Sequence, residues 1–191
     1  MKKQVLLVLT DMWADWEAAY TLHGINMLDD YEVKTVAADG VPKTSMGGLR
    51  VEIDCTIESY TDFSNTVMVI LPGGMNWKES RHDEIADFVK KAISHNIPIA
   101  AICGATMFLG KHGFLDNVKH TGDDLEFFTK EEGYNGQNNY IAAQIVSDGG
   151  FITANETAAL EFAKDIWNTL KIYKEEEVDA WYTSFKNGMV Q

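Results

Sequence analysis

The sequence is poor in the residues that mark several classes of protein. Its 191 residues include two cysteines, Cys55 and Cys103, and no second Cys or His lies near either at the spacing of metal ligands. We therefore expect no disulfide framework, no metal site and no cofactor. No apolar run approaches the ~20 residues that a membrane helix needs. Positive charge is scarce too, and a net charge of -13 argues against nucleic acid or an anionic membrane as a partner.

What remains is the composition of an ordinary globular protein. The chain is 46% hydrophobic and 24% charged, and it has no internal repeat, low-complexity tract or linker, which predicts one domain over residues 1–191. The start of the chain superficially resembles a signal peptide. However, its apolar run at residues 5–9 is too short and no small-residue cleavage site follows. We expect a first buried strand there and a cytoplasmic protein.

Short apolar runs alternate with amphipathic segments along the chain. This alternation predicts an α/β fold: a doubly wound, mostly parallel sheet with helices on both faces. The last helix, acidic and beginning near Glu175, is expected to cover the core or a partner subunit. The predicted strands lie at residues 4–9, 31–37, 66–71, 99–102, 140–146 and 151–154.

The most informative stretch is the apolar strand at residues 99–102, which breaks at Cys103. Gly104 and Ala105 then lead into a helical pattern, and a strand that turns abruptly into a helix with a nucleophile at the corner is a nucleophile elbow. Backbone strain would expose the side chain there, and the helix N-terminus would favour the thiolate. The alternative is that Cys103 is a buried core thiol, the usual fate of a free cysteine.

Two other loops are expected at the same edge of the sheet, where ligands bind in open α/β folds. In the first, Asp15 is a plausible helix N-cap, Trp13 lines a pocket or caps the core, and Glu17 faces the sheet edge. Alternatively, Glu17 is an ordinary acid of a first helical turn. In the second loop, Gly73 and Gly74 direct N–H groups at an oxyanion or simply form a tight turn.

The elbow itself offers two further candidates. The N–H of Gly104, directly after the candidate nucleophile, is a natural oxyanion donor. His120 lies in a polar loop after the elbow helix, where it could act as a base near the thiol. The other four histidines are expected on helix surfaces or at helix ends, and we interpret Cys55 as structural.

Together these segments resemble the ThiJ/PfpI family of the class-I glutamine-amidotransferase-like superfamily, in particular its small bacterial branch. The resemblance implies a flavodoxin-like sandwich in which Cys103 is the nucleophile and Glu17, often protonated, bonds its sulfur. It also implies that His120 lines the pocket, that Gly74 and Gly104 bind an oxyanion, and that the protein is a dimer or larger. The segments that carry it are VLLVLTD, DWEA, VMVILPGG, IPIAAICGATMFLGKHGFLDNVKHTGDDLE and FITANETAALEFAKDI.

The sequence also departs from some patterns of that family. Gly104 stands where members that resemble archaeal intracellular peptidases have a histidine. The C-T-G elbow of isonitrile hydratases and the His-x-Glu pair of glutamine amidotransferases are missing as well.

We therefore expect a cytosolic thiol enzyme that acts on a small carbonyl electrophile, with glyoxalase- or deglycase-type chemistry, and that is a homodimer. A cysteine peptidase or amidase is the alternative, and a non-enzymatic redox or stress sensor, or a holdase, is a second one.

Overall fold

Seven strands form the central sheet, in the order β5-β2-β1-β6-β7-β9-β8. A computed structural model describes residues 1–79 and 82–189. All neighbouring strands are parallel except β8, which is antiparallel to β9. The predicted α/β class with a mostly parallel sheet is therefore confirmed. The strands are β1 (Lys3–Val8), β2 (Tyr31–Ala37), β5 (Cys55–Thr56), β6 (Thr66–Leu71), β7 (Ile99–Ile102), β8 (Ile145–Asp148) and β9 (Phe151–Ala154).

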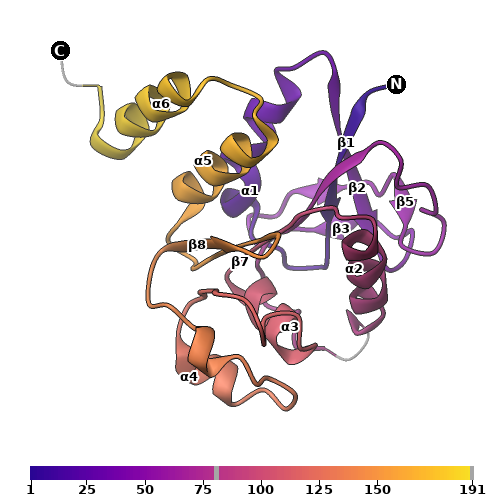
Figure 1. Cartoon of the computed structure of the whole chain (residues 1–191). Coiled ribbons are helices and arrows are strands. Elements are labelled where there is room, and N and C mark those ends of the chain that lie inside the picture. Colours follow the sequence, from indigo (N-terminus) through magenta and orange to yellow (C-terminus); the bar gives the residue numbers. More distant parts are fainter. Residues whose placement is uncertain (80–81, 190–191) are drawn as a thin grey trace.

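Helices cover both faces of this sheet (Figure 1). Helices α1 (Asp15–Asn26) and α5 (Ala159–Leu170) pack on one face, and α2 (Glu84–Ser94), α3 (Gly104–Lys111) and α4 (Leu125–Thr129) on the other. A 3₁₀ turn, η2, spans Gln137–Asn139. Two separate apolar cores result, because the side chains of each strand alternate between the two faces. None of the helices among the described residues is long and apolar enough to cross a membrane.

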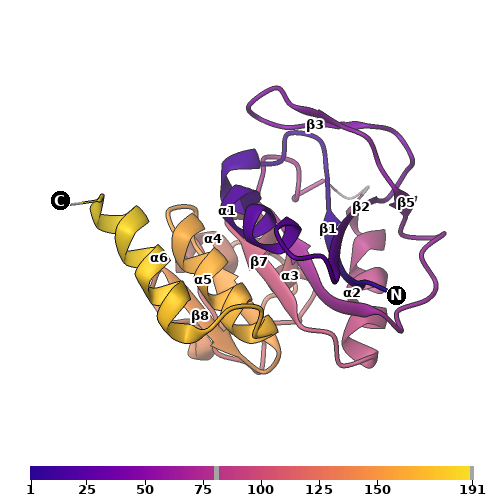
Figure 2. The same cartoon turned by 90° about the horizontal axis from the view of Figure 1, so that it is seen from above.

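The last helix, α6 (Glu175–Asn187), forms an outer layer on α5 and docks on the core, as predicted. Its Val178 is buried, and its Trp181 ring lies 4.3 Å from that of Trp167. Both views show α6 beyond α5, away from the sheet (Figures 1 and 2).

The outer strand β8 lies later in the chain than predicted. The sequence predicts a strand at residues 140–146, whereas β8 begins at Ile145. Residues 140–144 instead run beside the loop that holds His120. The Ile141 N–H donates to the His120 carbonyl at 2.8 Å, and the Thr121 hydroxyl donates to the Ala143 carbonyl at 2.7 Å.

A small hairpin, β3 (Lys43–Thr44) with β4 (Arg50–Val51), forms an arm over the start of α1 (Figure 2). The Ser45 hydroxyl donates to Asp15 Oδ2 at 3.0 Å, and the Met46 N–H donates to the Trp13 carbonyl at 2.8 Å. Asp15 is therefore not the N-cap that the sequence predicts. Ala14 occupies that position, and the Asp15 carboxylate bonds the hairpin instead.

Candidate active site

Cys103 stands at the corner between β7 and α3, as the elbow pattern predicts. Its backbone has φ 54° and ψ −131°, a strained region for a residue with a side chain. The corner is fixed from both sides. The Cys103 N–H donates to the Ala154 carbonyl at 2.9 Å, and its carbonyl accepts the Thr106 hydroxyl at 2.7 Å. The neighbouring strand β9 and the first turn of α3 thus hold the thiol in place.

Glycines are required where the loop after β6 meets this corner. A Cβ on Gly104 would lie 2.7 Å from the Gly74 carbonyl oxygen, and one on Gly73 would lie 2.6 Å from Cys103 Cβ. Both distances are shorter than real carbon contacts allow. The two candidate loops therefore meet backbone to backbone, which explains the small residues after each strand.

The side chain of Glu17 is fully buried and lies next to the Cys103 thiol. Its Oε2 accepts the Gly73 N–H at 2.7 Å, and its carboxyl group interacts with the Cys103 thiol. Among the residues that the structure describes, Oε1 has no hydrogen-bonding partner besides this thiol. Burial raises the pKa of Glu17 from 4.5 to about 7, against the opposing effect of its bonds with Gly73 and Cys103.

The thiol itself is held in its neutral form. Burial is the main cause that raises the pKa of Cys103, and the negative charges of Glu17 and Asp123 add to it, while a hydrogen bond from the Gly104 N–H opposes it. This corrects the expectation that the helix N-terminus makes Cys103 a thiolate. Desolvation and the nearby acids outweigh the hydrogen bond from the Gly104 N–H at the start of α3.

Two further acids complete the site, and the sequence reasoning missed both. Single ligand atoms of Cys103, Asp123 and Glu156 all lie within 4.8 Å of one another. Asp123 Oδ1 accepts the Glu156 N–H at 2.8 Å, which ties the loop before α4 to the end of β9. Glu156 lies two residues after the end of β9, so the strand-end rule could have found it. Asp123 carries no such signal.

The prediction that His120 acts as a base beside the thiol finds no support in the contacts that its ring makes. His120 is fully buried. One ring nitrogen bonds the Val118 carbonyl at 2.8 Å and the other bonds the Tyr134 hydroxyl at 2.7 Å. The ring packs against Phe128 and Tyr140, and burial lowers the pKa of His120. The histidine is a neutral part of the core.

The remaining predicted residues have the following places. The Gly73 N–H holds Glu17 and is therefore not free to bind an oxyanion, contrary to the prediction. Gly74 lies in the left-handed region with φ 153°, against the Met12 carbonyl. Trp13 is buried and pairs with Gly74 in an isolated bridge, so it caps the core. Gly104 directs its N–H at the thiol.

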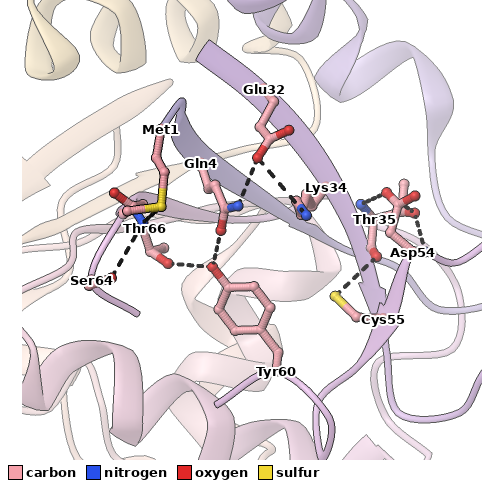
Figure 3. A network of polar contacts seen from close by, with 11 residues as sticks. Met1, Gln4, Glu32, Lys34, Thr35, Asp54, Cys55, Tyr60, Ser64 and Thr66 are labelled. Atoms are coloured by element: carbon pink, nitrogen blue, oxygen red, sulfur yellow. Dashed lines mark hydrogen bonds and ion pairs between the residues drawn. The ribbon is translucent and has the colours of Figure 1, made fainter. Parts of the chain in front are cut away.

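Cys55 lies far across the sheet from this site. Strands β2, β1 and β6 separate β5 from β7, and both cysteines are free thiols. Figure 3 shows the Cys55 sulfur turned to the Thr35 carbonyl, beside a polar network around Tyr60. The interpretation of Cys55 as structural agrees with this position.

The fold and the site define an α/β protein with a cysteine at a strained strand-to-helix corner, at the carboxyl ends of the strands. The model of the DJ-1/PfpI family matches residues 3–169, and the chain belongs to that family, which is also called ThiJ/PfpI. It is 35% identical to "Uncharacterized protease YdeA" of Bacillus subtilis (strain 168), over 94% of this chain and 88% of that protein.

Two solved structures are also similar. A thiJ/pfpI family protein from Bacillus anthracis superimposes with a TM-score of 0.92 at 32% identity, covering 99% of this chain and 92% of that one. The DJ-1 superfamily protein Atu0886 from Agrobacterium tumefaciens gives a TM-score of 0.88 at 31% identity, covering 97% of both chains. The family and the fold expected from the motifs are therefore confirmed.

Proposed function

We propose that the protein is a cytoplasmic thiol enzyme that converts a small α-oxoaldehyde, such as methylglyoxal, to a hydroxy acid. One observation carries the proposal: a buried carboxyl group whose pKa is raised to about 7 faces the thiol of a strained elbow. A base is most effective when its pKa lies near the working pH. Glu17 meets that condition beside a thiol that burial keeps protonated.

The first step is addition of Cys103 to the aldehyde carbon. A bond forms between the sulfur and that carbon while the thiol proton passes to ionised Glu17, and the carbonyl becomes an alkoxide. The Gly104 N–H lies beside the sulfur, and we assign it, with the Gly74 N–H, to the alkoxide. Each such donor contributes about 3 kcal/mol in measured oxyanion sites. Protonation of the alkoxide by Glu17 then gives a hemithioacetal.

The second step moves a proton between adjacent carbons. Glu17 removes the proton from the carbon attached to sulfur and returns it to the neighbouring carbon. The hydroxyl proton on the first carbon passes to the oxygen of the neighbouring carbonyl, so that the hemithioacetal becomes a thioester of a hydroxy acid. Water then cleaves the thioester and restores the thiol, and no oxidant or reductant is consumed. Because His120 is fully engaged elsewhere, we assign the whole proton transfer to Glu17.

The test is conversion of methylglyoxal to lactate by the purified protein. We expect turnover by the wild type and by Cys55→Ala, and loss of turnover in Cys103→Ala. Equal turnover by Cys103→Ala and the wild type would exclude the thiol mechanism. No turnover by the wild type of methylglyoxal or of its thiol and amine adducts would exclude this substrate class.

A second candidate function is hydrolysis of a peptide or amide by the same thiol. The name "protease" carried by the Bacillus subtilis relative favours it. Against it, the residue after the nucleophile is Gly104, and both ring nitrogens of His120 are bonded elsewhere, so neither of these two positions supplies an imidazole to protonate a leaving amine. Turnover of casein or an aminoacyl-coumarin above that of Cys103→Ala would support this function over the first.

A further inference from the structure

A pocket of about 240 Å³ lies between α1, α5 and α6, on the side of the molecule where α6 covers α5 (Figures 1 and 2). The last turns of α1 and α5, the loop that follows α5 and the first half of α6 line it. Gly24 belongs to this lining and lies about two turns, or about 10 Å, beyond Glu17 along α1. The pocket is therefore separate from the candidate active site.

Three aromatic side chains form walls of this pocket. The ring of Trp167 lies 5.5 Å from that of Tyr173, with the planes inclined by 71°, and 4.3 Å from that of Trp181, inclined by 56°. Because the planes are not parallel, the rings form a cup and not a stack. The Trp167 indole N–H donates to the Thr21 carbonyl at 3.3 Å, and the Tyr173 hydroxyl donates to the Gly24 carbonyl at 2.6 Å. Two of the three walls are thus fixed to α1 before any ligand binds, which lowers the entropic cost of binding.

The charges around the pocket favour a cation. Glu177 is the acid among its described lining residues, none of which is a lysine or arginine, and His23 lies at its exposed rim. Burial and then the Glu177 charge raise the pKa of Tyr173, so that carboxylate lies near the aromatic walls. Helices α1 and α5 both end here, and the C-terminal end of a helix carries partial negative charge. The faces of aromatic rings are negative as well.

We propose that the pocket between α1, α5 and α6 binds a small organic cation with a methylated ammonium group. Its charge is attracted by the ring faces and by Glu177, and its methyl groups suit apolar walls. A primary ammonium is disfavoured because it is strongly hydrated and needs three acceptors. The volume of about 240 Å³ is below the ~300 Å³ at which pockets for drug-sized ligands begin, so the ligand is of the size of choline.

The experiment is titration of the full-length protein with choline chloride, followed by tryptophan fluorescence, with sodium chloride at equal ionic strength as reference. We expect a saturable change with one choline per chain. Dimethylbutanol, in which carbon replaces the charged nitrogen of choline, should bind about 5-fold more weakly or worse. Equal binding of choline and dimethylbutanol would overturn the preference for a cation. The absence of a saturable change with both choline and tetramethylammonium would overturn the site.

Two variants locate the bound choline. Trp181→Leu should weaken binding by about 5-fold or more and Glu177→Gln by about 3-fold or more. The glutamine keeps an oxygen for the Lys174 N–H, which Glu177 Oε2 accepts at 3.1 Å, so the start of α6 is retained. Glu176→Gln is the matched control, because Glu176 is exposed and outside the lining, and its titration should equal that of the wild type. Wild-type affinity in both Trp181→Leu and Glu177→Gln would reject the pocket.

Two further measurements need no variant. Choline should leave the alkylation rate of Cys103 by iodoacetamide unchanged, because the pocket is separate from the thiol, and slower alkylation would place choline at the thiol instead. Methylated ammonium groups also occur in lipid headgroups. Sedimentation with phosphatidylcholine vesicles, without binding of free choline, would therefore overturn the assignment to a small free molecule. None of these readouts uses methylglyoxal, so the result is independent of the proposed function.

Discussion

Two polar pairs among the described residues, Glu17 with Cys103 and His120 with Tyr134, differ in how completely they are bonded. Both ring nitrogens of His120 have partners at ordinary distances. Glu17 has one oxygen bonded to a backbone N–H, and its other oxygen has no partner besides the thiol among the described residues, beside a residue with φ 54°. A satisfied pair stabilises the core, whereas an incompletely bonded pair at a strained corner keeps its capacity to react.

Burial favours the neutral form of the titratable group in both pairs, but the consequences differ. Burial lowers the pKa of His120 and raises the pKa of Glu17 to about 7. His120 is thereby fixed as a neutral structural group. Glu17 is brought into the pH range where it can take up and release a proton. Buried position alone therefore does not identify the reactive group.

The largest expected effect is on catalysis, and it should distinguish the Glu17–Cys103 pair from the His120–Tyr134 pair. Cys103→Ala should lower methylglyoxal turnover by about 1,000-fold or more, because the covalent step is lost. It should leave the midpoint of thermal unfolding close to that of the wild type. Steady-state kinetics and a thermal melt measure the two quantities, with Cys55→Ala as control. Turnover retained in Cys103→Ala would remove the distinction between the pairs.

His120→Ala should show the opposite pattern. The change leaves a cavity among aromatic rings and removes the partner of the buried Tyr134 hydroxyl, which should reduce the free energy of unfolding by about 3 kcal/mol. Denaturant unfolding measures this loss. Turnover per folded molecule should stay near that of the wild type. A fully stable but inactive His120→Ala would restore His120 as a catalytic base.

Glu17→Gln should change how stability depends on pH. Because the folded pKa of about 7 lies above the ordinary 4.5, the folded state holds more protons than the unfolded state between these values. Stability of the wild type should therefore fall as pH rises from 4.5 to 7, by up to about 3 kcal/mol. Glu17→Gln should lack this fall, because the amide does not ionise. Urea unfolding at several pH values tests it, and parallel pH profiles for the two proteins would contradict it.

The smallest expected effect concerns the acids around the thiol. Asp123→Asn should lower the pKa of Cys103, because the Asp123 charge raises it, and should therefore speed alkylation of Cys103 at pH 8. Site-by-site mass spectrometry measures the rates, with Cys55 in the same sample as the reference. An unchanged Cys103 rate would show that Asp123 does not act on the thiol.

Much of the fold followed from local pattern. Strands β2, β6, β7 and β9 were predicted with the bounds that the structure has. For β6 and β7 the reason is that short apolar runs between helices are buried in a parallel sheet. The error at β8 arose where residues 140–144, mixed in polarity, pair with the His120 loop instead of with β9. Sequence pattern alone does not distinguish the two partners.

The candidate site also has parts that followed from the sequence and parts that only the tertiary structure decided. The sequence by itself determined the elbow at Cys103, the glycines that let two loops meet and the acid in the first turn of α1, because each is dictated by neighbours along the chain. Only the tertiary structure decided that His120 turns into the core, that Asp123 and Glu156 gather at the sulfur, and that the thiol is kept neutral. The physical reason is that desolvation and charge interactions depend on distance in space, and these residues are brought together only when the sheet forms.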